Sequence, residues 1–144
     1  MMGQADHQQN WLLSSLDLDP VELVNANSDH PVVLVCEHAG QAVPSVLNGL
    51  GLPPGALDAH IGWDIGARAV TLRLAKALGM PAVLQRYSRL VIDCNRPPAA
   101  PDSVPAVSDG VLVPDNAGLN DNARQARVSE IFEPFHDATA ALLD

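Results

Sequence analysis

PVVLVCEHAGQAVP, from Pro31 to Pro44, is the stretch that indicates the fold class of this chain. Its residues 32–35 form a continuous apolar run, which is typical of a strand that is buried on both faces of a sheet. The run ends abruptly at Glu37, His38 and Gly40. Because open α/β sheets bind their ligands at the carboxyl ends of the strands, we expect Glu37 and His38 to lie in a functional site.

A second stretch, RYSRLVIDCNRP from Arg86 to Pro97, surrounds a short apolar run with charged and amide side chains. Residues 90–94 are predicted to form a strand, with Arg89 just before it and Asn95 and Arg96 just after it. A guanidinium group binds a carboxylate through two parallel hydrogen bonds. Several arginines at strand ends therefore predict a site for a small acidic substrate.

An amphipathic helix is predicted between these two stretches, over residues 64–78. Asp64 is a suitable N-cap for it, and Gly79 stands where a helix C-cap belongs. The pattern also allows an earlier start, near Ala56. A strand over residues 82–85 is expected to follow the helix, either separate from the strand over residues 90–94 or joined to it as one bent strand.

The last segment, residues 120–143, places apolar side chains on one face of a second helix. Pro134 should kink this helix or mark a fresh start, because proline has no backbone N–H to donate. Strands that alternate with helices indicate an α/β fold, a layered sheet flanked by helices. Only two or three strands are recognisable, fewer than a typical sheet contains, so the chain resembles part of a larger α/β domain.

Two segments outside these elements give weaker signals. Residues 1–30 are polar and acidic, and we expect a partly ordered N-terminal arm with a short helix near residues 20–24. Residues 97–119 hold five prolines, and so long a connection in a compact domain is usually functional or mobile. The predicted division is an arm over residues 1–30 and a domain over residues 31–144.

Composition limits the classes of function. A length of 144 residues favours one domain, and a net charge of −9 argues against binding to nucleic acid or to an anionic membrane surface. No signal peptide or membrane-spanning stretch is recognisable, so a cytoplasmic location is expected. Cys36 and Cys94 are expected to be buried apolar side chains and not a disulfide.

Four motifs together identify a family resemblance: CEHAGQAVP at 36–44, HIGWDIGA at 60–67, QRYSRLVIDCNRP at 85–97 and DSVPAVSDG at 102–110. In order and spacing they resemble the N-formylglutamate amidohydrolase family. The resemblance implies a zinc carboxypeptidase-like (phosphorylase/hydrolase-like) fold. It also implies amide hydrolysis that releases formate from N-formyl-L-glutamate, a step of histidine catabolism. Many relatives with the EHAG form of the first motif have no assigned substrate, so the chemistry is implied more firmly than the substrate.

Members of that family are about twice as long as this chain. Their second half supplies a further histidine-bearing strand, which is expected to complete the metal site. The resemblance therefore implies that this chain is a fragment or a truncated form, and that its own site is incomplete.

The resemblance implies a catalytic zinc ion with His38 as a ligand. In zinc carboxypeptidases a glutamate three positions after the first ligand also binds the metal, but here that position holds Gln41, a poor ligand. Glu37 and Asp64 are the candidates for a second ligand, since zinc accepts carboxylate oxygens beside imidazole. Asp64 and His60 are also the candidate catalytic residues, with an N-cap role for Asp64 and a structural role for His60 as alternatives.

Asn95 and Arg96 resemble the pair that holds the substrate carboxylate in carboxypeptidase-like enzymes, and Arg89 is the next candidate for substrate binding. The alternative for Asn95 and Arg96 is an ordinary turn with a surface ion pair. Asp93 is expected to fix an arginine or a histidine. Ser88 has no base at a recognisable spacing, so it is not a candidate nucleophile.

Two functions remain open at this point. The first is a zinc-dependent amidohydrolase that acts on a small acidic N-acyl amino acid. The second is a non-catalytic, truncated module that binds an acidic metabolite or another chain, with self-association through an unpaired sheet edge.

Overall fold

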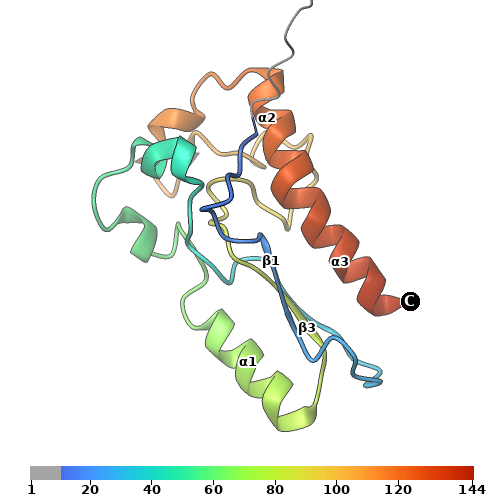
Figure 1. Cartoon of the computed structure of the whole chain (residues 1–144). Coiled ribbons are helices and arrows are strands. Elements are labelled where there is room, and N and C mark those ends of the chain that lie inside the picture. Colours follow the sequence, from blue (N-terminus) through green and yellow to red (C-terminus); the bar gives the residue numbers. More distant parts are fainter. Residues whose placement is uncertain (1–10) are drawn as a thin grey trace, which may run out of the picture.

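The computed structural model describes residues 11–144 as a mixed α/β structure (Figure 1). Its main sheet has three strands in the order β1-β3-β2, with β1 antiparallel and β2 parallel to the central β3. A two-stranded hairpin, β4-β5, forms a second, smaller sheet. The strand bounds are Val21–Val24 (β1), Leu34–Cys36 (β2), Ala82–Gln85 (β3), Val107–Ser108 (β4) and Val111–Leu112 (β5).

The helices surround the main sheet and the loops at one of its ends (Figure 1). They are η1 (Ser45–Gly51), η2 (Ala56–Asp58), α1 (Ala67–Leu78), η3 (Pro114–Asn116), α2 (Asp121–Arg127), η4 (Val128–Phe132) and α3 (Glu133–Leu143). The segment η4 is a π-helical turn, and α3 begins with Pro134 in its first turn. Phe132 and Glu133 at this junction are both in the right-handed helical conformation, so Pro134 accompanies a change from π-helical to α-helical geometry and not the start of a separate helix. No helix in residues 11–144 is long and apolar enough to cross a membrane.

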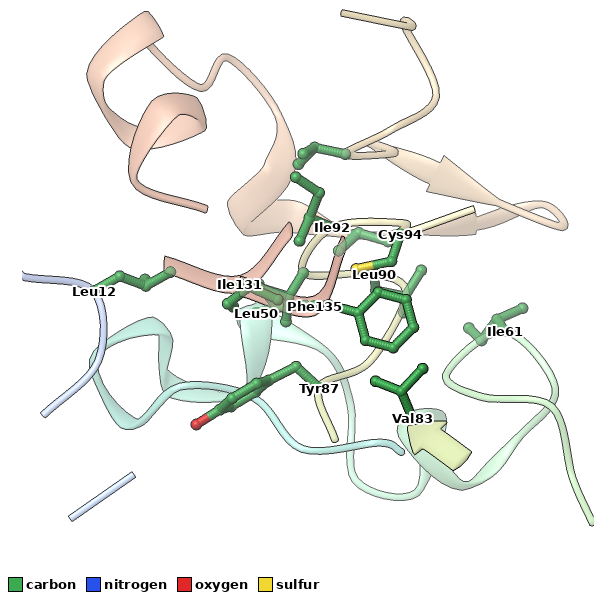
Figure 2. Packing of buried hydrophobic residues seen from close by; sticks show 13 residues of the cluster. Leu12, Leu50, Ile61, Val83, Tyr87, Leu90, Ile92, Cys94, Ile131 and Phe135 are labelled. Carbon is green, nitrogen blue, oxygen red and sulfur yellow. The ribbon is translucent and has the colours of Figure 1, made fainter. Parts of the chain in front are cut away.

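Successive side chains of β3 point to opposite faces of the sheet, and this explains why a packed layer lies on each face. Ala82 and Leu84 pack with Ala75 of α1 on one face of the sheet. Val83 belongs to the larger core on the other face, together with Phe135 of α3 (Figure 2). Because successive side chains of a strand point to opposite faces, a four-residue strand is enough to separate the two helices.

The predicted strand over residues 90–94 is not formed, although these residues are buried. The chain crosses the core here as an irregular segment (Figure 2). Its backbone groups bond to other parts of the protein: Asn116 Nδ2 donates to the Leu90 carbonyl at 2.7 Å, and Arg127 Nη1 donates to the Val91 carbonyl at 2.8 Å. These side chains replace the partners that a neighbouring strand would supply.

Three other expectations about local structure are wrong. Residues 21–24 form strand β1 and not a helix, because they pair with β3. The β2 strand is not buried on both faces, since the side chain of Val35 is 39% exposed. Helix α1 begins at Ala67, after Gly66 in a left-handed conformation, so Asp64 is not its N-cap. The C-cap at Gly79 is confirmed.

The long connection over residues 97–119 contains the β4-β5 hairpin and η3. The first ten residues of the predicted N-terminal arm, His7 among them, lie outside the described residues. Cys36 and Cys94 are buried free thiols, as expected. Burial raises the pKa of Cys94 to about 12, so this thiol stays protonated.

Candidate functional site

His38 is the centre of the candidate site. It follows β2 directly, is buried, and has a carboxylate at each ring nitrogen. Its Nε2 lies 2.6 Å from Asp93 Oδ1, and its Nδ1 lies 3.2 Å from Asp64 Oδ2. The segments that carry His38 and Asp64 also meet through the backbone, because the Asp64 amide donates to the His38 carbonyl at 2.9 Å.

Asp93 is buried beside His38, and several nitrogen atoms of other residues lie close to its carboxylate. The backbone N–H of Asn95 donates to Asp93 Oδ1 at 2.9 Å. Its Oδ2 lies 3.4 Å from Arg96 Nε and 3.8 Å from Arg89 Nη2. Asp93 therefore contacts both a histidine and arginines, and it connects the two regions where the motifs predicted metal and substrate binding.

Asp64 is half-exposed and lies between His38 and Arg89. Its second oxygen accepts a hydrogen bond from Arg89 Nη1 at 3.0 Å. With its N-cap role ruled out by the geometry of α1, its side chain contacts only candidate site residues within the described part of the chain. Asp64 is therefore placed between two other candidate site residues and outside the cap of α1.

A cavity of about 530 Å³ adjoins His38. Its walls include Glu37, His38 and Asp64, the three residues predicted as metal ligands, together with Val35 and the first turn of α1. Nevertheless, no three histidine, cysteine, aspartate or glutamate side chains in residues 11–144 are arranged to hold a metal ion. His38 and Asp64 are close enough to act together, whereas Glu37 only shares the cavity.

A second cavity, of about 220 Å³, contains Arg89 and Arg96 together with Asp93. We call it the arginine cavity. Asp102 and the hairpin residues Ser108 and Asp109 also line it. Two of the three predicted substrate-binding residues thus come together, whereas Asn95 is exposed and does not line this cavity.

His60 lies apart from His38. Its side chain is 70% exposed, and its Nε2 lies 2.7 Å from Asp109 Oδ2 of the hairpin. Ser88 is buried and donates to the Gly62 carbonyl at 2.7 Å, which gives this serine a structural contact.

Sequence reasoning assigned no role to Asp102 or Asp109, the partners of Arg96 and His60. Arg96 Nη1 lies 2.8 Å from Asp102 Oδ2. The available signal was their place in the fourth motif, residues 102–110, which begins and nearly ends with these two aspartates. Only the structure shows which side chains they accompany.

The His38–Asp93 pair predicts a pH-dependent stability. Burial opposes the charged imidazolium, but the hydrogen bond and the negative charge of Asp93 outweigh it and raise the pKa of His38 above 6.5. Burial also opposes the Asp93 carboxylate, but its hydrogen bonds with His38 and the Asn95 amide hold its pKa below 3.8. The contribution of His38 to the free energy of unfolding is lost as the pH rises through the pKa of His38 in the folded protein. The contribution of Asp93 is lost as the pH falls through the pKa of Asp93 in the folded protein.

The free energy of unfolding contributed by this pair is therefore expected to be greatest between pH 3.8 and pH 6.5. Urea unfolding across about pH 3 to pH 9 measures it. The His38→Gln variant is the control, because it removes the imidazole titration and should weaken the decline on the alkaline side. A decline of equal size in both proteins would contradict the assignment to His38.

Comparisons with known proteins found a matching family model and a similar solved structure. A family model described as N-formylglutamate amidohydrolase matches residues 30–144. The crystal structure of gene product Atu2144 from Agrobacterium tumefaciens is similar to this chain, with a TM-score of 0.88 and 38% sequence identity. The match covers 91% of this chain and 52% of that chain, so this chain spans about half the length of that neighbour. A comparison with curated proteins found no significant match.

Proposed function

This chain belongs to the N-formylglutamate amidohydrolase family, and on that basis we propose that it carries the substrate-binding and part of the metal-binding machinery of a hydrolase for small N-acyl amino acids. The family supports an amidohydrolase-like function. Zinc dependence, a carboxypeptidase-like fold of the whole domain and a role in amino-acid catabolism are the finer parts of the proposal.

The observation that supports it best is the chain of contacts from His38 to the arginine cavity. Asp93 holds Nε2 of His38, so the other ring nitrogen faces Asp64 and the larger cavity. Arg89 contacts Asp64 and also lines the arginine cavity. A substrate carboxylate bound by the arginines would thus lie next to the group that acts on the amide. Holding a substrate against a catalytic group in this way lowers the activation free energy of enzyme reactions.

The residues fit the proposed zinc ion only in part. Nδ1 of His38 and Oδ2 of Asp64, 3.2 Å apart, can serve as two ligands, but the described residues do not form a three-ligand set. Completion would need a movement of Glu37, which shares the cavity wall, or a ligand from another polypeptide segment. When bound, zinc would supply Lewis acidity and lower the pKa of a water to about 7.

The protein's own side chains would orient the metal ligand and bind the substrate. Asp93 keeps the His38 ring in one orientation, as carboxylates behind metal-binding histidines generally do. Arg89 and Arg96 would bind the substrate carboxylate, and the backbone N–H of Asn95 would help to hold Asp93 beside them. Asp64 is the proposed catalytic carboxylate. His60 is proposed to act at the rim, where it contacts Asp109 on the wall of the arginine cavity.

Formate release from N-formyl amino acids tests this proposal. The assay uses the 144-residue chain and any longer natural polypeptide that contains it, with and without added Zn²⁺. We expect zinc-dependent hydrolysis, and we expect His38→Ala to lower kcat/KM by at least about 100-fold, because loss of a metal ligand should cost no less than the roughly 10- to 100-fold lost when a residue behind a ligand is mutated.

His136→Ala is the matched control. This histidine bonds to the Cys94 carbonyl and lies on α3, away from both cavities, so its loss should leave kcat/KM nearly unchanged. No hydrolysis of any N-formyl or N-acyl amino acid by any of these polypeptides, with zinc present, would refute the proposed activity.

We propose a non-catalytic binding module that self-associates as the second candidate. Among the described residues, β2 pairs with a strand on one side only, and Val35 of β2 and Val70 and Leu74 of α1 are exposed. Unpaired edges with apolar neighbours favour association. Light scattering on the purified chain separates the candidates: a monomer that hydrolyses substrate at ordinary rates would rule this one out.

A further inference from the structure

The arginine cavity is not a positively charged pocket. Two guanidinium groups line it, from Arg89 and Arg96, but so do three carboxylates, from Asp93, Asp102 and Asp109. His38 contacts Asp93, and Asp64 contacts Arg89. Even with positive charges on His38 and on His60 beside Asp109, these groups and the cavity lining together would carry no net positive charge. A dianionic ligand would therefore find little electrostatic attraction in it.

Both arginines already have carboxylate partners. Arg96 Nη1 lies 2.8 Å from Asp102 Oδ2, and its Nε lies 3.4 Å from Asp93 Oδ2. Arg89 Nη1 donates to Asp64 Oδ1 at 3.0 Å. Within residues 11–144, the Nη2 group of each arginine makes no hydrogen bond; the closest carboxylate oxygen to Arg89 Nη2 is 3.8 Å away. The Nη2 groups that remain on the two arginines can together bind one carboxylate of a ligand.

We propose that this cavity selects substrates with a single carboxylate, and that Asp102 sets the selection by neutralising Arg96. The substrate class is then an N-acyl amino acid with an uncharged side chain, rather than the dicarboxylate N-formylglutamate. This inference rests on the proposed function, since it concerns the substrate of the same site. Asp102 acts through Arg96 and is a positioning residue.

Charge, and not shape, carries the argument. The side chains of glutamine and glutamate have nearly the same size, so a cavity of about 220 Å³ cannot distinguish them by volume. A second carboxylate, however, would lie near Asp102 or Asp109 and be repelled. Charged groups a few ångströms apart near a protein surface interact strongly enough to change affinity by more than tenfold.

Isothermal titration calorimetry of the 144-residue chain with N-formyl-L-glutamine and N-formyl-L-glutamate tests the proposal. At neutral pH and low salt, we expect N-formyl-L-glutamine to bind at least about tenfold more tightly. This ratio should fall at high salt, because salt screens the repulsion. Asp102→Asn should lower the ratio at least about fivefold, chiefly by tightening the binding of N-formyl-L-glutamate.

Asp137→Asn is the matched control. It makes the same change in net charge on an exposed position of α3, so the ratio should not change. The Asp102 side chain is itself 55% exposed, which makes misfolding of Asp102→Asn unexpected; Asp102→Ala provides a second variant.

Equal or tighter binding of N-formyl-L-glutamate would overturn the selection, and an unchanged ratio in both Asp102 variants would overturn the role of Asp102. Failure of both ligands to bind, or binding of neither being weakened by Arg96→Ala, would show that this cavity does not take the carboxylate. The proposed function fails separately, through the absence of formate release. Hydrolysis with a preference for N-formyl-L-glutamate would refute only the present inference.

Discussion

Gly40→Ala is expected to lower the free energy of unfolding by more than about 3 kcal/mol, because no side chain fits at this position. A Cβ atom on Gly40 would overlap the backbone oxygen of Arg86 and lie 2.5 Å from its carbonyl carbon. The Arg86 segment cannot easily move away. The Ala42 amide donates to the Arg86 carbonyl at 3.2 Å, and the Ser88 amide donates to the Ala42 carbonyl at 2.8 Å.

Gly118→Ala is the control for this prediction. Gly118 has a φ of 68°, but a Cβ atom there would meet nothing within 4 Å. Its replacement should destabilise the protein by only about 1–2 kcal/mol, the strain of a left-handed conformation. Guanidinium chloride unfolding of the two variants compares them, and equal losses of stability would show that the contact with Arg86 does not matter.

Asp93→Asn is the second change with a large expected effect, a loss of about 3 kcal/mol of stability near neutral pH. The variant keeps the size of the side chain but removes the charge that faces His38 and the two arginines. Its removal leaves the buried His38 ring without its charged partner, whereas the side chains of Arg89 and Arg96, 28% and 45% exposed, still reach water. The pKa of His38, now without the carboxylate that raises it, should fall.

Chemical unfolding gives the stability, and an NMR titration of the His38 ring gives the pKa. Asp109→Asn is the control, because Asp109 and His60 form a similar pair with both side chains 70% exposed. An exposed pair of this kind contributes at most about 1 kcal/mol. If the two variants lost equal stability, burial of Asp93 could not be the reason for its importance.

Local signals predicted several elements well. The periodic apolar pattern before Gly79 identified α1, and the pattern before and after Pro134 identified the C-terminal helical region. The apolar run before Glu37 identified β2, although the strand starts only at Leu34. These features depend on residues close together in the chain, so the sequence shows them directly.

Two failures arose where distant partners decide the local structure. Residues 21–24 are extended because they pair with β3, about sixty positions later in the chain. Residues 90–94 look like a strand in sequence, yet no strand in residues 11–144 lies beside them, and they bond instead to the side chains of Asn116 and Arg127. An apolar run indicates burial, but it does not say which groups will satisfy the backbone.

The family and the residue types of the site can be recognised in the sequence alone: a histidine after an apolar run, carboxylates near it, and arginines around a second apolar run. Their pairing depends on the tertiary structure. It placed His38 between Asp64 and Asp93, set Asp102 against Arg96, and left Asn95 outside the arginine cavity. Hydrogen bonds and ion pairs act over about 3–4 Å, so the partners depend on how distant segments pack and not on their order in the chain.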